Sequence, residues 1–172
     1  MYKYLLYFLI FSFLGWCAEV IFHRVTRGEW VNRGLAHGPV CPIYGVGICL
    51  CQALLGGVES LALLALCSMA IATAVELAVG YLTERVLARR LWDYTAERGN
   101  ILGYVCPRFS LIWGIAIAAV IRLLPLLDGV IEVLDRPIFK AAAFVSFALI
   151  LMDETAQAIK TGKGRGGRAT TK

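Results

Sequence analysis

The sequence has few charged residues and almost no histidine. Of its 172 residues, 17% are charged and two are histidines, whereas 59% are hydrophobic. A soluble domain carries about a quarter charged residues. The surplus apolar side chains are therefore expected to face lipid, and the length suits one compact bundle.

Several chemical signatures are also missing. The sequence contains no GxxxxGK[ST] motif, so we expect no ATPase in this chain. Its six cysteines include no CxxC pair and lie mostly in apolar runs, which favours packing roles over a disulfide framework. With two histidines a zinc site is weakly supported, and no nucleophile–base pair is visible. We therefore expect no metal and no cofactor, and the sequence does not indicate an enzyme.

Five apolar segments are candidates for membrane crossings, each of which needs about 20 residues. They are Tyr4–Phe22, Ile43–Gly57, which is short, Ser60–Leu82, Phe109–Leu127 and Ile138–Ile159. The pattern predicts an all-α fold, an integral membrane helical bundle of about five transmembrane helices. We assign residues 1–160 to this transmembrane domain. Residues 161–172 are rich in glycine and basic residues and lack large apolar ones, which predicts a disordered basic tail.

The basic residues predict the orientation. Connections rich in arginine or lysine alternate along the chain with connections that have almost none, and cytoplasmic loops carry the basic excess. The basic ones contain Arg24, Arg27 and Arg33, then Arg85, Arg89, Arg90, Arg98 and Arg108, then the tail from Lys160. This places the N-terminus outside and the C-terminus in the cytoplasm of a multi-pass protein of the cell membrane. The net charge of +5 then reflects topology, so we expect the lipid bilayer and no nucleic acid as a partner.

Two of the connections between the predicted spans are expected to form structure of their own. The segment 32–45 is dense in glycine and proline and cannot form regular helix, so we expect an inner loop that tucks back into the protein. The segment 83–107 begins like a helix and contains Trp92 and Tyr94, which favour the headgroup zone. It predicts an interfacial helix.

Carboxylates inside apolar segments are the strongest functional signal. Glu19, Glu76 and Asp153 belong to three different predicted spans, and each would lie about 7 Å to the cytoplasmic side of its helix centre. A charge at such a position costs at least about 2.5 kcal/mol on insertion scales. We expect the three to share a cavity, with Arg33 and Arg108 as counter-charges. The alternative is that these ion pairs only hold the bundle together.

The third span adds a spacing argument. Glu76, Gly80 and Glu84 recur every four residues and lie roughly on one helical face. A glycine at that position would let another helix or a loop approach closely.

A set of short motifs resembles a known family. The motifs are Gly15-Trp16 with Glu19, Asn32-Arg33-Gly34, Gly38-Pro39, Pro42-Ile43-Tyr44-Gly45, Glu76 with Gly80, Trp92-Asp93-Tyr94, Asn100 with Gly103, and Ser110 with Trp113-Gly114. Over roughly 15–114 the chain is similar to the bacterial family named "putative ABC-transporter type IV", the CmpB-like permeases. The resemblance implies a membrane permease subunit paired with a separate ATPase, without a soluble catalytic domain. Because five spans are few for a solitary transporter, a homodimer is a further expected partner.

The motifs and the charges together define a candidate polar or substrate-binding site, with no residue assigned a catalytic role. It comprises Glu19, Asn32, Arg33, Tyr44, Glu76, Glu84, Asp93, Arg108 and Asp153.

Two other functions stay open at this point. An intramembrane enzyme acting on a lipid or lipid-linked substrate could use the carboxylates for acid–base chemistry and Arg33 or Arg108 for a phosphate group. A non-transporting assembly partner would use small residues such as Gly56 and Gly57 for helix contacts.

Overall fold

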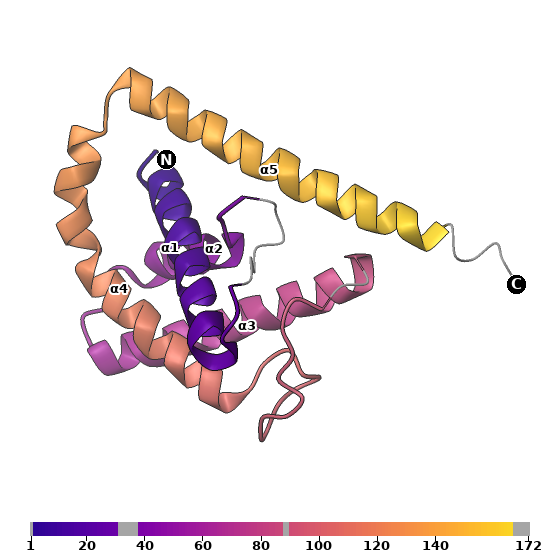
Figure 1. Cartoon of the computed structure of the whole chain (residues 1–172). Helices are drawn as coiled ribbons and strands as arrows, with labels where there is room; N and C mark the ends of the chain where they lie inside the picture. The colour runs from indigo at the N-terminus through magenta and orange to yellow at the C-terminus, as the bar shows by residue number, and fades with distance from the viewer. Residues whose placement is uncertain (1, 31–37, 88–89, 167–172) are drawn as a thin grey trace, which may run out of the picture.

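The described part of the chain folds into five helices. The computed structural model describes residues 2–30, 38–87 and 90–166, and all structural statements concern these. The helices are α1 (Tyr2–Arg27), α2 (Pro42–Leu55), α3 (Leu61–Leu87), α4 (Pro107–Val133) and α5 (Pro137–Gly166), as Figure 1 shows. The described part of the chain contains no strand beyond one isolated bridge between Ile101 and Val105. The predicted all-α class is confirmed.

Three of these helices are long and apolar enough to cross a membrane. They cover Tyr2–Thr26, Leu61–Val86 and Pro107–Val133. α2 is apolar but has only 14 residues, as its short predicted span suggested. α5, which carries Lys140, Asp153 and Glu154, is not among the candidate spans. Crossings by α2 and α5 therefore stay predictions.

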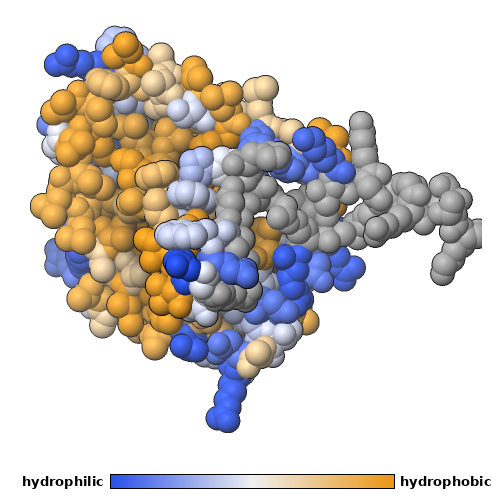
Figure 2. Space-filling view, in the orientation of Figure 1, coloured by the Kyte–Doolittle hydropathy of each residue, from blue (hydrophilic) through white to orange (hydrophobic). Residues whose placement is uncertain are grey.

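The helices pack through small residues. α1 lies along α2 and α3 lies along α4, while α5 contacts α1 and α3. A Cβ built on Gly114 of α4 would lie 2.6 Å from Met69 Cβ and 2.8 Å from the Ala65 carbonyl oxygen of α3. Only glycine permits this close approach of two helices. The surface seen in Figure 2 is largely apolar over the helices, which suits contact with lipid.

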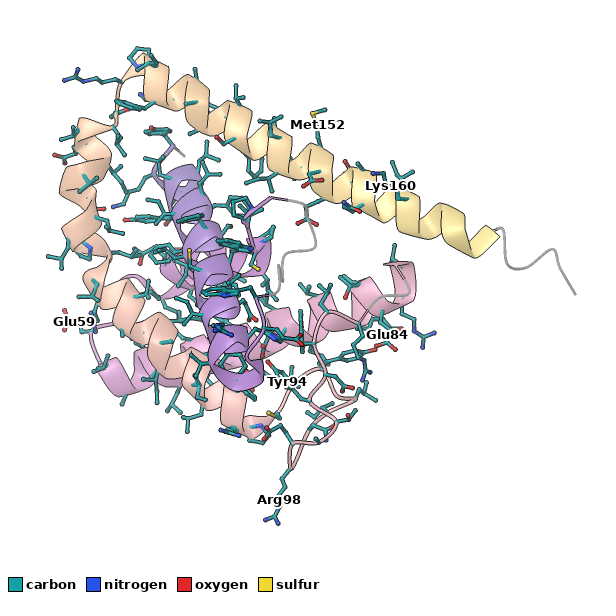
Figure 3. All side chains as sticks on the ribbon, viewed as in Figure 1. Glu59, Glu84, Tyr94, Arg98, Met152 and Lys160 are labelled. Atoms are coloured by element: carbon teal, nitrogen blue, oxygen red, sulfur yellow. The ribbon has the colours of Figure 1, made fainter. Side chains whose placement is uncertain are left out.

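The segment that follows α3 differs from the expectation. α3 continues to Leu87, and residues 90–106 form a loop of turns instead of the interfacial helix that we predicted. The backbone has positive φ at Gly99, Leu102 and Gly103, a conformation that helices do not use. Tyr94 N donates to the Gly103 carbonyl at 2.8 Å, which closes the loop, and Arg98 projects from it (Figure 3).

The end of the chain also bears on the assigned domains. α5 extends beyond Lys160 to Gly166, inside the stretch for which we expect a disordered tail. Residues 167–172 lie outside the described part, so the tail stays a prediction.

Replacing Gly103 by alanine should open the loop formed by residues 90–106. Gly103 has φ +73°, and an added Cβ would lie 2.7 Å from Thr95 Cγ2 and 2.9 Å from Arg90 Nη1. The left-handed conformation alone costs a non-glycine residue roughly 1–2 kcal/mol. Gly28→Ala is the matched control, because Gly28 has φ +75° with nothing near its Cβ. Thermal unfolding of the purified protein in detergent should show a larger loss for Gly103→Ala, and equal losses would contradict the proposed packing.

Candidate functional site

A cavity of about 380 Å³ is lined by residues of all five helices and of the loop that follows α3. Three carboxylates reach its wall, from Glu19 of α1, Glu76 of α3 and Glu154 of α5. Four aromatic side chains complete its polar side, namely Tyr44, Trp92, Tyr94 and Trp113. Most other lining residues are aliphatic.

Glu19 is held by the first residues of α2. The Tyr44 hydroxyl donates to Glu19 Oε1 at 2.5 Å. Gly15 makes room for this contact, because a Cβ there would lie 2.6 Å from Tyr44 Cβ. α2 itself is fixed on α1 by the Cys41 N–H, which donates to the Ser12 carbonyl at 2.9 Å. One turn of α1 therefore supplies both the space for Tyr44 and the carboxylate that it binds.

Glu76 is the most buried carboxylate of the cavity wall, with 9% of the residue exposed. Its Oε1 accepts hydrogen bonds from Trp113 Nε1 at 3.0 Å and from the Tyr94 hydroxyl at 3.4 Å. Its Oε2 is buried, and nothing in the described chain donates a hydrogen bond to it. A buried polar atom without a partner is costly, so this oxygen is a natural point of attachment for a ligand or a proton.

Tyr94 belongs to the loop and is held in place from two sides. Its ring stacks on Phe109 with centroids 4.7 Å apart. Burial, followed by the nearby Glu76 charge, raises the pKa of its hydroxyl above the usual value. Tyr94 therefore keeps its proton and acts as a hydrogen-bond donor to Glu76 at neutral pH.

The loop docks on α3 at Gly80, as the spacing argument predicted. A Cβ on Gly80 would lie 2.9 Å from Tyr104 Cδ1. The Tyr104 carbonyl also accepts a hydrogen bond from Trp92 Nε1 at 2.7 Å. The glycine thus lets the loop approach α3 one turn from Glu76, where Trp92 and Tyr94 close the cavity.

Two predicted carboxylates lie outside this cavity. Glu84 accepts a hydrogen bond from Arg90 Nε at 2.8 Å, two turns along α3 from Glu76, and is labelled in Figure 3. Asp93 is largely exposed and accepts from the Thr95 N–H at 3.0 Å and from Arg90 Nη1 at 3.0 Å. The Thr95 N–H and the neighbouring Arg90 hold the pKa of Asp93 below its usual value. Both residues stabilise the loop rather than line the cavity.

One of the two expected counter-charges, Arg108, lies away from the cavity. Arg108 pairs with Glu97 at 3.3 Å, and its side chain is 69% exposed. Our expectation that it neutralises the bundle carboxylates is therefore wrong, because its long side chain turns from the start of α4 to the loop and to solvent. Asn32 and Arg33 lie outside the described residues, so their part in the site stays a prediction.

In α5 the residue that lines the cavity is Glu154, the neighbour of the predicted Asp153. Asp153 accepts the Gly38 N–H at 3.4 Å and is not among the lining residues, whereas Glu154 is. Consecutive helical residues point about 100° apart, so an acid that faces the loop leaves the next one to face the cavity. The sequence shows both acids, but it does not show how α5 is rotated about its axis and therefore which of the two faces the cavity. Trp113 was visible as part of a motif, but only the fold shows that it binds Glu76.

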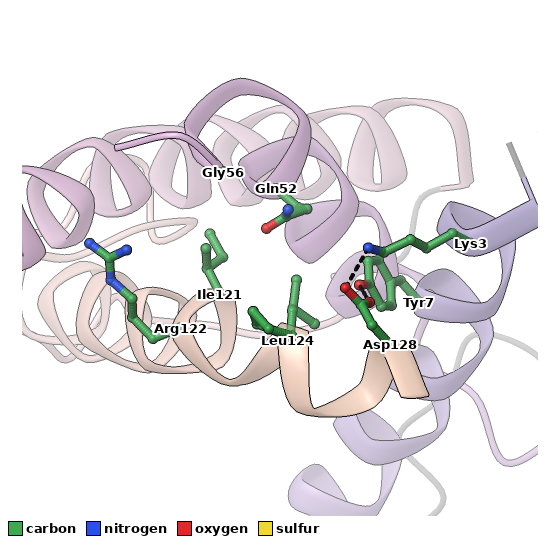
Figure 4. Close-up of a pocket in the computed structure, with 9 residues that line it drawn as sticks. Lys3, Tyr7, Gln52, Gly56, Ile121, Arg122, Leu124 and Asp128 are labelled. Atoms are coloured by element: carbon green, nitrogen blue, oxygen red, sulfur yellow. Dashed lines mark hydrogen bonds and ion pairs between the residues drawn. The ribbon is translucent and has the colours of Figure 1, made fainter. Parts of the chain in front are cut away.

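A second, smaller polar cavity of about 120 Å³ lies near the other end of α1 (Figure 4). The Tyr7 hydroxyl donates to Asp128 Oδ1 at 2.7 Å, and Lys3 pairs with Asp128 Oδ2 at 2.8 Å. Arg122 donates to the Val58 carbonyl at 2.8 Å and to the Glu59 carbonyl. Lys3 and Glu19 are separated by about 24 Å along α1. These bonds tie α1, α4 and the α2–α3 connection together at the end remote from the carboxylate cavity.

Comparison with known proteins gives one finding. A family model described as "Putative ABC-transporter type IV" matches residues 6–158, which include every described residue of the cavity wall. Neither the curated proteins nor the solved structures give a match. The match covers most of the chain and agrees with its apolar helices, and this protein therefore belongs to the family "Putative ABC-transporter type IV".

Proposed function

We propose that this chain is the membrane permease subunit of an ATP-driven transporter, and that the cavity beside Glu19 and Glu76 is its solute site. The observation that carries the proposal is the convergence of carboxylates from three helices on one aromatic and aliphatic cavity. Charges inside apolar segments are expensive and commonly mark a substrate or ion pathway. The family to which the chain belongs supports the transport role.

The position of the cavity along the helices also supports this function. Glu19 and Glu76 lie in the second halves of α1 and α3, which the positive-inside rule orients toward the cytoplasm. With this orientation the cavity opens near the cytoplasmic side, where an ATPase subunit would act. The energy source is then a separate ATPase, and a second copy of this chain would complete the pathway.

Enzymatic action on a phosphate-bearing lipid has less support. That function needs a cation to hold the phosphate, and Arg108 is engaged with Glu97 outside the cavity. The lining residues that the structure describes include no lysine, arginine or histidine. A phosphate next to Glu19, Glu76 and Glu154 would meet like charge, which disfavours binding.

Deletion and complementation in the native cell test the transport function. Small molecules inside and outside the cells are compared for the deletion strain and for the same strain carrying the wild-type gene. We expect at least one solute to change its distribution between cell and medium, and the gene to restore it. Transport of that solute by membrane vesicles should need ATP and fail with a non-hydrolysable analogue. Unchanged distributions, or transport that runs without ATP, would contradict the proposal.

A further inference from the structure

We infer that the cavity binds a monovalent organic cation with an apolar body, of the class of quaternary or protonated amines. This inference rests on the proposed role of the cavity as a solute site and adds the chemical class of the solute. It depends on three features of the wall, namely its charge, its aromatic rings and its aliphatic remainder.

The charge of the wall favours a cation. Glu19, Glu76 and Glu154 line the cavity, and its described lining residues carry no basic side chain. Glu76 accepts two hydrogen bonds on Oε1, while its buried Oε2 has no donor within the described chain. A buried carboxylate is stabilised by an opposite charge nearby. A cationic ligand beside Glu76 would supply that charge.

The aromatic rings favour an organic cation. A cation within about 6 Å of the face of a tryptophan or tyrosine is attracted by the ring, and cages of such rings bind quaternary ammonium groups. Tyr44 and Trp113 meet edge to face, with centroids 5.3 Å apart and ring planes at 86°. Two perpendicular rings form a corner, and both belong to the same wall as Glu76. Trp92 and Tyr94 line the cavity from the loop.

The remainder of the wall argues for an apolar body and against a bare metal ion. Aliphatic residues of three helices line the cavity, including Val46, Val75 and Ile117. No group of three or more His, Cys, Asp or Glu side chains that could hold a metal ion is found among the described residues. A cavity of about 380 Å³ is also far larger than a metal ion requires. An ammonium group with hydrocarbon substituents can contact the carboxylates, the aromatic rings and the aliphatic residues of the wall at once.

A matched pair of small molecules tests the inference directly. Benzyltrimethylammonium carries one positive charge, and neopentylbenzene has the same shape with carbon in place of nitrogen. Phenylmethanesulfonate supplies the negative counterpart. Each is titrated into the purified full chain in an uncharged detergent, and binding is followed by calorimetry and by the rise in Tm that a ligand of the folded state causes.

We expect only the ammonium compound to bind saturably. Glu76→Gln should weaken its binding about tenfold or more, because a buried charge pair is lost. Glu132→Gln, which removes an exposed carboxylate near the end of α4, should leave binding unchanged. Equal binding of neopentylbenzene, binding of the sulfonate instead, or full affinity in Glu76→Gln would overturn the inference.

The two proposals fail in different ways. If the ammonium compound binds through Glu76 but the deletion strain shows no change in any solute, the cation site survives and the permease function fails. If a solute depends on the chain for transport but no ammonium compound binds, the permease function survives and the chemical class fails.

Discussion

Glu76→Gln should reduce transport of the solute identified by deletion about tenfold or more while leaving the fold intact. The glutamine side chain retains a carbonyl oxygen that can accept the Trp113 and Tyr94 hydrogen bonds now made to Oε1. What it loses is the negative charge. Transport by membrane vesicles and thermal unfolding of the purified variant measure the two effects separately.

The expected stability of this variant is what makes the experiment decisive. A buried carboxylate oxygen without a hydrogen-bond donor destabilises a folded protein, and an amide in its place carries a smaller desolvation cost. Tm should therefore stay unchanged or rise. A purely structural carboxylate would behave in the opposite way, since its loss would lower Tm and transport together.

Glu132→Gln serves as the matched control in the same assays. It removes one carboxylate from the opposite end of the bundle, where the side chain is exposed. Transport and Tm should both remain at the wild-type level. A loss of transport in this variant as large as that of Glu76→Gln would show that net charge, rather than the cavity, controls activity.

Composition and periodicity are enough to predict the helical class and the three helices that are long and apolar enough to cross a membrane. Apolar runs of sufficient length leave few alternatives to a helix in lipid, since every backbone group must be satisfied within the segment. The error at 83–107 has a different origin. The basic and aromatic residues there fit an interfacial helix, but Gly99 and Gly103 adopt positive φ and close the segment into turns. In this segment the backbone conformation of the glycines, and not the amphipathic character of the side chains, determines the structure.

The candidate site was predictable only to the level of individual helices. Depth along each helix led us to expect Glu19, Glu76 and Asp153 in one cavity, because rise per residue is a fixed property of a helix, and Glu19 and Glu76 do line the same cavity. Rotation about the helix axis is set by packing, and it brings Glu154 rather than Asp153 to the wall. The direction of a long side chain is harder still to predict, and Arg108 pairs with Glu97 of the loop instead of with the carboxylates of the cavity.

Gly45→Ala should be among the most destabilising small substitutions in the chain. A Cβ on Gly45 would lie 2.5 Å from the Phe8 carbonyl oxygen and 2.8 Å from Phe8 Cδ2, and it would also contact Ser12 Oγ. One of these atoms, the Phe8 carbonyl oxygen, belongs to the backbone of α1 and cannot move aside without the helix. Separating α1 from α2 should cost about 1–3 kcal/mol, measured as a fall in the Tm of the purified protein.

Gly47→Ala gives the internal control for this effect. Gly47 lies in the same helix and is also buried, but a Cβ there meets nothing within 4 Å. Alanine favours helix over glycine by up to about 1 kcal/mol, so Gly47→Ala should leave Tm unchanged or raise it. The contrast separates helix packing from helix propensity. If both variants lost the same stability, α1 and α2 would not be in the close contact that brings Tyr44 onto Glu19, and the geometry of the cavity wall would have to be revised.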